Sequence, residues 1–469
     1  MYQSSETIPT LDLFPMHLIR KDSPWLALEQ LIPWRKLEVL LKDLFSSSDR
    51  GRKSIPVRHV LGALIIQNKM NLTDRDTIDM ISDMPALQYF LGLPTYEPIE
   101  LFDFTLLCKY RQLLGIDLSQ EMIEELLKFN GVNLEPETGK THRGSLSIDA
   151  TVAPVNITYP TDLKLLNVAR EQSEKLIDDL YKKSALSSKP RTKRKKARAD
   201  YLLYAKAKNL SRNKRFTANR MQLQYIDRNV KTIEKYANEG VFVLDDSQTE
   251  VIETIKQIYE QQHHMWETKT NRVDDRVVSF SQPHVRGIVR GKAGTKIEFG
   301  PKIAASKVNG YIILDKISFP NFNESQTLME IIGKYKEKYG VYPEVVRADK
   351  IYQTRDNKTY CKSLGIRLSG PKLGRKPKDE EILKADREVQ LQDLRKRQEI
   401  EGVFGVAKTK YGLEKLMTKL PESQIASIGL IFFVMNLVRI LDKVSFYAEI
   451  EVLVLSITDN EMCYVFEDE

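Results

Sequence analysis

The sequence predicts an α/β protein with an α-helical N-terminal domain and an α-helical insertion. Three observations carry this prediction. Apolar residues recur at helical spacing between residues 55 and 130, β-branched runs typical of strands follow from Arg143, and a long charged helical stretch separates those runs. The chain has 469 residues, of which 42% are hydrophobic, so several domains with their own cores are expected.

The N-terminal region, residues 1–135, reads as short helices. Thr73 with Asp76 three residues later predicts a helix start, and Gly92 predicts the end of a helical turn. The apolar positions at helical spacing are Val60, Leu61, Leu64 and Ile65. A DNA-binding helix-turn-helix and an ordinary small helical bundle both fit this pattern.

Four runs have the composition of strands, and the first is SLSIDATV at residues 145–152. The others are TKIEF at 295–299, GYIILDKISF at 310–319 and PEVVRAD at 343–349. We expect these runs to be core strands of an α/β domain formed by residues 136–160 and 283–424. Residues 161–282 then form a basic helical insertion, and residues 425–469 form a C-terminal helix and tail.

The charge balance favours an anionic partner. Lys and Arg number 72 against 64 acidic residues, which gives a net charge of +8 and a pI near 9.0. In KPRTKRKKAR, Lys189 to Arg198, seven of ten residues are basic and none is acidic. A solvated helix face and a contact with nucleic-acid phosphates both explain this run. On the second interpretation, the DNA-binding residues are Lys193, Arg194, Lys195 and Lys196.

Several other classes of protein are disfavoured. The first ten residues lack the basic and apolar regions of a secretory signal, so we expect a cytoplasmic protein. The apolar stretch Ile425–Val438 is shorter than the roughly 20 residues needed to span a bilayer, which predicts a buried core helix and no membrane. Cys108, Cys361 and Cys463 lie far apart without a C-x-x-C motif, so they support neither a disulfide framework nor a thiolate zinc site.

Two aspartates stand at the ends of apolar strand-like runs. Asp149 ends SLSID, and Asp349 ends EVVRAD. A strand buried on both faces has little use for an uncompensated carboxylate, although each residue alone also fits a turn or a helix cap. A third carboxylate from another element would favour a site for two Mg²⁺ ions, because such a site needs several oxygen ligands.

The segment RKRQEIEGVFGVAKTKYG, residues 395–412, supplies a candidate. At about 100° per residue, Glu401 lies about 40° and Lys408 about 20° from Arg397, whereas Glu399 lies about 200° away. Apolar residues flank the charged stripe: Ile400, Phe404, Ala407 and Tyr411. We therefore expect Glu401 at the edge of the core and Glu399 in solvent. A metal and phosphate site and a surface salt-bridged helix both remain open on this geometry.

The spacing Leu394-(2)-Arg397-(3)-Glu401-(6)-Lys408 resembles the Y-(2)-R-(3)-E-(6)-K signature of the DDE transposases of bacterial insertion sequences. The resemblance extends along most of the chain. Residues 55–115 are similar to the InsH-type N-terminal transposase domain, and residues 143–163 and 345–378 are similar to the regions of the two catalytic aspartates. Departures are Leu394 in place of Tyr, and Ile351 and Gln353 where many relatives have Gly and Asp.

The resemblance implies an RNase H-like fold, a mixed sheet flanked by helices with the aspartates on adjacent strands and the glutamate on a helix packed against them. It implies that Asp149, Asp349 and Glu401 are the catalytic residues and ligands of two Mg²⁺ ions, for which Mn²⁺ can substitute. Arg397 and Lys408 correspond to DNA-lining positions.

The implied function is a transposase that binds the ends of its insertion sequence, cleaves DNA strands and joins the 3′-hydroxyl to target DNA. The expected partners are transposon-end and target DNA, with a homodimer on DNA, in the bacterial cytoplasm at the nucleoid. Two alternatives remain: a non-enzymatic DNA-binding protein derived from a transposase, and a metal-dependent nuclease that cuts without joining.

Overall fold

The structure is a computed structural model that describes residues 14–44, 55–132, 141–207, 209, 211–289, 297–370 and 380–464. The chain divides into two compact units. The first contains Met1–Ala153, Lys302–Ser318 and Phe322–Glu469, and the second contains Pro154–Pro301 and Phe319–Asn321. The second unit thus begins and ends outside the insertion expected from sequence, residues 161–282. The expected boundary between residues 135 and 136 lies outside the described residues.

Short helices form the N-terminal part of the first unit, as the sequence predicts. They are η3 (Met16–Leu18), α1 (Pro24–Leu31), α2 (Trp34–Leu41), η4 (Lys42–Leu44), α3 (Val57–Met70), α4 (Asp74–Asp83), α5 (Pro85–Phe90), α6 (Thr105–Leu113) and α7 (Ile116–Phe129). The Thr73 hydroxyl accepts a hydrogen bond from the Asp76 backbone N–H at 3.2 Å, which caps α4. Gly92 adopts a φ of 80°, and a Cβ there would meet the Arg58 side chain at 2.7 Å.

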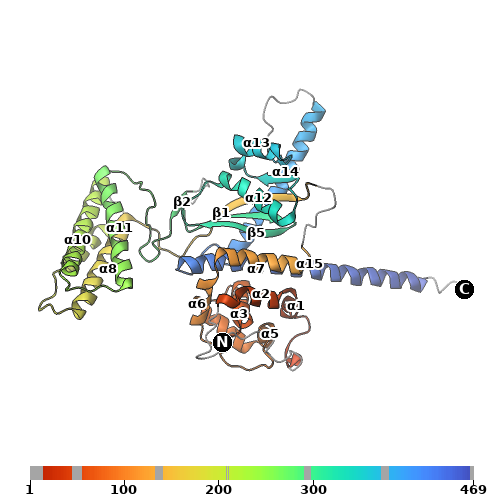
Figure 1. The fold of residues 1–469 in the computed structure, drawn as a ribbon, viewed down its shortest axis with the longest axis horizontal. Coiled ribbons are helices and arrows are strands. Elements are labelled where there is room, and N and C mark those ends of the chain that lie inside the picture. The colour runs from red at the N-terminus through yellow and green to blue at the C-terminus, as the bar shows by residue number, and fades with distance from the viewer. Residues whose placement is uncertain are drawn as a thin grey trace. The chain divides into compact units, whose positions relative to one another are not determined.

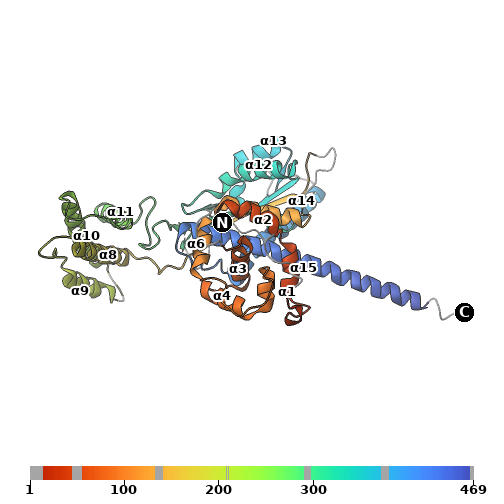
Figure 2. The ribbon, with the colours of Figure 1, turned by 60° about the horizontal axis from the view of Figure 1, so that its bottom comes forward.

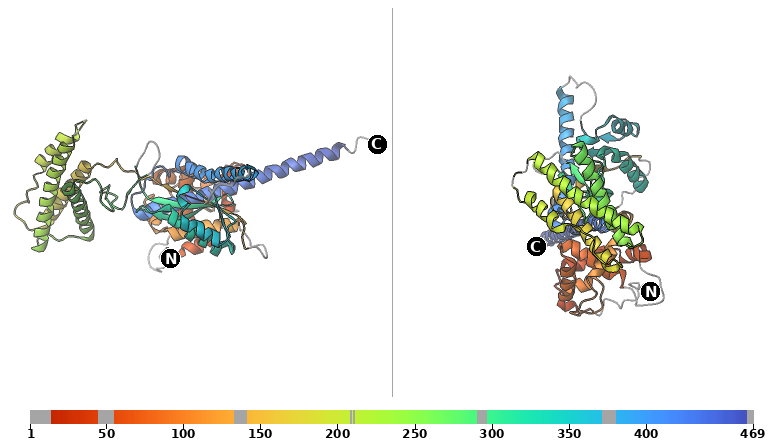
Figure 3. Two further views of the ribbon diagram at one scale, coloured as in Figure 1. Left: turned by 90° about the horizontal axis from the view of Figure 1, so that it is seen from above. Right: turned by 90° about the vertical axis from the view of Figure 1, so that its left-hand side faces the viewer.

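The C-terminal helix α15 (Pro421–Tyr464) forms the centre of this packing. It contacts α1, α3, α6 and α7 on one side and the sheet on another, and it forms one continuous helix in Figure 3. Residues Pro421–Ser445 are long and apolar enough to cross a membrane, but 72% of the most apolar window is buried inside the protein. Phe432, Phe433 and Leu437 are almost fully buried. This agrees with the core helix expected from the sequence.

A five-stranded mixed sheet lies beside these helices (Figure 1). Its strands, in spatial order, are β5 (Tyr311–Ser318), β4 (Lys302–Val308), β1 (Ser145–Val152), β6 (Val345–Ala348) and β7 (Arg367–Leu368). The β5–β4 and β4–β1 pairs are antiparallel, whereas the β1–β6 and β6–β7 pairs are parallel. The α/β fold with a helical N-terminal region is therefore confirmed.

One strand prediction needs correction, and one strand of the main sheet was missed. The described part of TKIEF forms β3 (Ile297–Phe299), which pairs with β2 (Gly287–Val289) in a separate two-stranded ladder instead of joining the main sheet. Thr295 and Lys296 lie outside the described residues. The main sheet instead contains β4, whose sequence KIAASKV was not recognised because its two lysines obscure the apolar pattern. Lys302 and Lys307 are nevertheless largely buried, because each forms an ion pair with a glutamate.

Helices cover both faces of the sheet. Ile148 and Val346 pack with residues of α12 (Leu328–Tyr339) and α13 (Arg355–Ser363) in one hydrophobic core. The adjacent residue Arg347 points the other way and pairs with α14 (Glu380–Lys410). Since successive side chains of a strand alternate between faces, α14 covers the face opposite α12. Short turns η5 (Glu324–Thr327) and η6 (Lys350–Tyr352) complete the connections.

The edge strand β5 is capped by two helices. The Asn436 side chain of α15 accepts a hydrogen bond from the Ile312 N–H at 2.9 Å and donates one to the Ile312 carbonyl at 2.7 Å. Gln120 of α7 donates to the carbonyls of Leu314 and Asp315 at 2.6 and 3.3 Å. These side chains satisfy backbone groups that an open edge would leave unpaired, so they join the helical region to the sheet.

The second unit is a helical bundle with its own core. Its helices are α8 (Asp162–Lys183), α9 (Arg194–Ala205), α10 (Arg212–Asn238) and α11 (Asp246–Thr268), which pack together in Figure 2. Leu166, Ile226 and Ile255 are fully buried between three of the helices. Arg170 is also buried, where it donates to Glu174, Gln222 and Asn167 at 2.6 to 3.0 Å. The helical insertion predicted from the sequence is therefore confirmed as a helical body.

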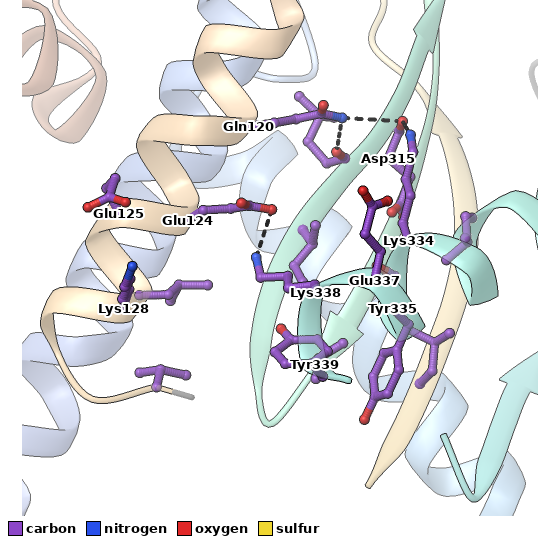
Figure 4. Close-up of a pocket in the computed structure, with 18 of the residues that line it drawn as sticks. Gln120, Glu124, Glu125, Lys128, Asp315, Lys334, Tyr335, Glu337, Lys338 and Tyr339 are labelled. Atoms are coloured by element: carbon purple, nitrogen blue, oxygen red, sulfur yellow. Dashed lines mark hydrogen bonds and ion pairs between the residues drawn. The ribbon is translucent and has the colours of Figure 1, made fainter. Parts of the chain in front are cut away.

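A cavity of about 780 Å³ lies between α7, β5 and α12, and Asp315 is one of the residues that line it (Figure 4). Asp315 is 7% exposed, and its Oδ2 has no hydrogen-bond partner among the described residues. Burial raises the pKa of Asp315 from 3.8 to about 7, against the opposing effect of a hydrogen bond from Ser306. The folded protein therefore holds a proton on Asp315 at pH values at which the unfolded chain has released it.

We expect the free energy of unfolding to fall as pH rises from about 4 to about 7, because the folded state binds the Asp315 proton more tightly than the unfolded state. Asp315→Asn removes this titration. The difference in free energy of unfolding between the variant and the parent protein should shift in favour of the variant by up to a few kcal/mol between pH 5 and pH 8. One pKa unit corresponds to about 1.4 kcal/mol. Urea denaturation at both pH values measures the change. Asp79→Asn, at an exposed position of α4, is the control, and an equal change in both variants would contradict the prediction.

Candidate active site

The pairing of β1 with β6 brings Asp149 and Asp349 together. Ile148 is paired with Ala348 in the parallel ladder, so the two aspartates are the next residues in the same register. Residues in register on adjacent strands point to the same face of a sheet and lie about 5 Å apart. The sequence predicted that Asp149 ends its strand, but this is wrong. Strand β1 continues to Val152, because Asp149 to Val152 still pair with β4. Only β6 ends at this point.

The two aspartates occupy different environments. Asp149 is half-buried and accepts a hydrogen bond from the Ala150 N–H at 2.8 Å. Burial, together with the nearby carboxylates of Glu324 and Glu401, raises its pKa to about 6, against the opposing effects of the Ala150 hydrogen bond and the charge of Arg397. Asp349 is more exposed and caps η6, where it accepts a hydrogen bond from the Lys350 N–H at 2.7 Å.

Arg397 of α14 links the acidic residues. Its guanidinium Nη1 lies 2.9 Å from Glu401 Oε1 and 3.6 Å from Asp349 Oδ1. The charges of both Glu401 and Arg397 act on Asp149. The structure thus gathers Asp149, Asp349, Glu401 and Arg397 at one end of the β1–β6 pair, although they come from separate parts of the chain.

The apolar stripe of α14 is buried as expected: Ile400, Phe404, Ala407 and Tyr411 are at most 5% exposed. Glu399 is exposed to solvent as expected, but it also has a partner that the sequence did not reveal. Glu399 pairs with Lys307 of β4 at 2.8 Å, and this hydrogen bond lowers the pKa of Glu399. Its side chain is 55% exposed and that of Glu401 is 50% exposed, so the two glutamates differ in partner rather than in exposure. Helical angles could not reveal this, because they contain no information on the neighbouring strand.

A buried ion-pair cluster also holds α14 on the sheet. Asp393 pairs with Arg347 of β6 at 3.0 Å and with Arg367 of β7 at 2.5 and 2.9 Å. Asp393 is 5% exposed. It lies one helical turn before Arg397 and two turns before Glu401, so its ion pairs set the position of those side chains over the aspartates. The sequence reading missed Asp393, because an acid in a charged helical segment is usually solvated.

The site contains a fourth acid. Glu324 acts on the charge state of Asp149 and is held by Lys302 at 2.9 Å. No sequence signal distinguished it from other loop acids. A hollow of about 470 Å³ adjoins the site between the ends of β6 and β7 and helix α14, lined by Arg387, Gln390, Leu394 and Arg397 among others.

The basic run lies in the second unit and is not uniform. Arg194 donates to the carboxylate of Asp178 at 2.8 and 2.9 Å, and Lys196 pairs with Asp200 at 3.2 Å. Lys193 and Lys195 are exposed, and neither forms an ion pair with the described residues. Two of the four predicted DNA-binding residues therefore have local carboxylate partners. Lys408 lies on α14, half-buried and seven residues beyond Glu401.

The donor atoms at the site suit a hard divalent cation. Carboxylate oxygens are the ligands that Mg²⁺ prefers. Burial is the main cause of the raised pKa of Asp149, and the carboxylates of Glu324 and Glu401 add to it with negative charge that a cation would neutralise. In the part of the chain that the structure describes, no group of three or more His, Cys, Asp or Glu side chains is arranged to hold a metal ion. The residue types fit, whereas the close convergence of Asp149, Asp349 and Glu401 stays a prediction.

Two family models of transposase domains match parts of the chain. The family model of the Transposase DDE domain matches residues 346–438, and that of the Transposase domain (DUF772) matches residues 15–113. Both matches support a DDE transposase of an insertion sequence. The first match contains Asp349, Arg397, Glu401 and Lys408, whereas Asp149 lies outside both matches. No curated protein and no solved structure matches the chain.

Asp393→Ala should destabilise the first unit by roughly 3 kcal/mol, because it leaves the buried Arg347 without its partner. Urea denaturation measures the loss, and hydrogen exchange should show faster opening of α14. The matched control is Glu388→Gln, at an exposed position on the same helix, which should change stability by less than about 0.5 kcal/mol. Equal stability of the two variants would show that the cluster does not hold α14.

Proposed function

We propose that this chain is an active DDE transposase that binds the ends of its insertion sequence, cleaves DNA strands and joins the freed 3′-hydroxyl to target DNA. The observation that carries the proposal is the register of β1 and β6 together with Arg397. The register pairs Ile148 with Ala348, the residues just before the two aspartates, and Arg397 lies 3.6 Å from Asp349 and 2.9 Å from Glu401, which supports a shared site. The mixed sheet, with Asp149 on β1, Asp349 directly after the adjacent strand β6 and Glu401 on the covering helix, supports an RNase H-like catalytic domain.

In this proposal Asp149, Asp349 and Glu401 hold two Mg²⁺ ions, or Mn²⁺ in their place. When bound, the ions lower the pKa of the attacking water or hydroxyl and stabilise the leaving 3′-oxygen. The chain itself provides the orientation. Arg397 keeps Glu401 and Asp349 facing each other, and the ion pairs of Asp393 and Glu399 fix the helix that carries Arg397. Ligands that are positioned in advance need little reorganisation when DNA binds.

We assign a role to each part of the chain in this proposal. Residues 1–135 form the N-terminal transposase domain, residues 136–160 and 283–424 the catalytic domain, residues 161–282 the basic insertion and residues 425–469 the C-terminal helix and tail. Lys193 and Lys195 remain the stronger phosphate contacts of the basic run, since carboxylates neutralise Arg194 and Lys196. We further propose a cytoplasmic, nucleoid-associated protein that acts as a homodimer on DNA.

Two other functions are compatible with parts of this arrangement. A DNA-binding descendant of a transposase would be expected to have lost an acid, but Asp149, Asp349 and Glu401 are all present. A nuclease that cuts without joining would use the same acids. Incubation with the terminal DNA of the element, target DNA and Mg²⁺ separates these functions: joined products support the transposase, cut ends alone support the nuclease, and intact bound DNA supports the binding protein.

Glu401→Gln should reduce strand cleavage by roughly a thousandfold, because metal ions contribute several kcal/mol and each 1.4 kcal/mol is a factor of ten. Asp149→Asn and Asp349→Asn should behave in the same way. Glu399→Gln is the matched control on α14: its partner is Lys307 instead of the acids, so most cleavage should remain. Gel analysis of labelled transposon-end DNA measures both. Equal losses for Glu399→Gln and Glu401→Gln would refute the assignment of Glu401.

Lys408→Ala should weaken binding to transposon-end DNA and slow cleavage when DNA is limiting. Lys408 lies seven residues, or about 10 Å, beyond Glu401, which is too far for the same metal cluster and suits a phosphate further along the DNA. Much of the activity should return at saturating DNA, as expected for a residue that acts in binding. Normal binding combined with lost cleavage at saturation would instead assign Lys408 to the chemical step.

A further inference from the structure

A basic, aromatic groove in the second unit is separate from the KPRTKRKKAR run. It has a volume of about 670 Å³ and lies where the start of α8, the end of α9 and the start of α10 meet. This volume falls within the range of roughly 300–1,000 Å³ typical of pockets for small molecules or parts of larger ligands. All of its lining residues belong to the second unit.

The groove carries a net positive charge. Its charged lining residues are Lys164, Arg212, Arg215, Arg276 and Asp162. Arg276 pairs with the single acid, Asp162, which leaves three cations without a neutralising carboxylate. The side chains of Arg215 and Lys164 make no hydrogen bond or ion pair with other described residues, and Arg212 only stacks over Phe216, at 5.9 Å from the ring centroid. Arg194 and Lys196 of the basic run, by contrast, are held by acids.

Aromatic side chains lie among these cations. Tyr201 and Tyr204 are three residues apart on α9 and therefore share one side of the helix, and Phe216 belongs to α10. All three are half-buried. Neither tyrosine hydroxyl has a hydrogen-bond partner within the described ranges, whereas the hydroxyl of Tyr225, also in this unit, donates to Asp200 at 2.7 Å. The two tyrosines thus offer both ring surface and free hydroxyls to a ligand.

We propose that this groove binds an unpaired stretch of a DNA strand, with phosphates on Arg212, Arg215 and Lys164 and a base stacked against Tyr201 or Tyr204. A cationic groove with stacking aromatics is the combination that recognises single strands without regard to sequence. A duplex hides its base faces, so it would use the cations but not the rings. The inference rests on the proposed function only in taking DNA as the partner of the chain.

Fluorescence anisotropy with a labelled mixed-sequence single strand, and with its duplex, tests the groove over a range of salt concentrations. The full-length protein should bind the single strand more tightly. Arg212→Gln with Arg215→Gln should weaken that binding about tenfold and reduce the salt slope by about 1.4, the value for two lost phosphate contacts. The matched control is Lys231→Gln with Lys235→Gln, which removes two charges from the same helix about 24 Å away and should change binding little.

The aromatic contribution is tested separately. Tyr201→Leu with Tyr204→Leu should weaken single-strand binding about tenfold while leaving the salt slope unchanged, because the lost contact is stacking. Tyr201→Phe with Tyr204→Phe should retain binding, which also excludes misfolding as the cause. Equal losses in the arginine and control lysine pairs, or a preference for duplex, would overturn the proposal.

The outcomes also separate this inference from the proposed function. Normal cleavage and joining by the parent protein, with unaltered single-strand binding in the groove variants, rejects the groove alone. A parent protein that neither cuts nor joins, but binds single strands through Arg212 and Arg215, retains the groove and rejects the transposase activity.

Discussion

The parallel pairing of β1 with β6 is the constraint on which the candidate site depends. A shift of one residue would send Asp349 to the opposite face of the sheet from Asp149. The register is held by burial, since Ile148 and Val346 occupy the core beneath α12, and exchanging faces would expose both. The same alternation that buries these apolar residues turns Ser147, Asp149 and Arg347 toward α14. Packing of the apolar side chains on one face of the sheet therefore fixes the positions of the acidic side chains on the other face.

Ion pairs join helix α14 to that second face, in addition to its buried apolar stripe. Asp393 contacts β6 and β7, and Glu399 contacts β4, so the helix is held on both sides of β1. The buried pair between Arg347 and Asp393 contributes less to net stability than its geometry suggests, because both charges lose hydration. The ion pairs instead fix where the helix lies along the sheet, because each charged side chain meets its partner in only one position of the helix. Arg397 and Glu401 lie on the segment that these contacts fix.

The second unit is stabilised by interactions within itself. It has its own apolar core and its own buried polar network around Arg170, so its helices do not depend on the sheet for their packing. Its sequence is rich in Lys and Arg, but acids of the same unit neutralise some of them. Cations without such partners gather at the groove that contains Arg212 and Arg215. The number of basic residues is therefore a poor guide to where an anion would bind, whereas the pairing of each charge is informative.

The sequence by itself determined the helical N-terminal region, the strands at residues 145–152 and 311–318, the helical body between the strands and the buried stripe of α14, because each depends on local periodicity. It also singled out Asp149 and Asp349, as acids at the ends of strand-like runs, and Arg397 and Glu401, through helical angles and the resemblance to the DDE transposase signature. Tertiary structure alone decided that Ile297–Phe299 leaves the main sheet, that Glu399 pairs with Lys307, and that Asp393 joins α14 to two strands. These features depend on partners distant in the chain, and no local pattern encodes which strand or charge a residue will meet.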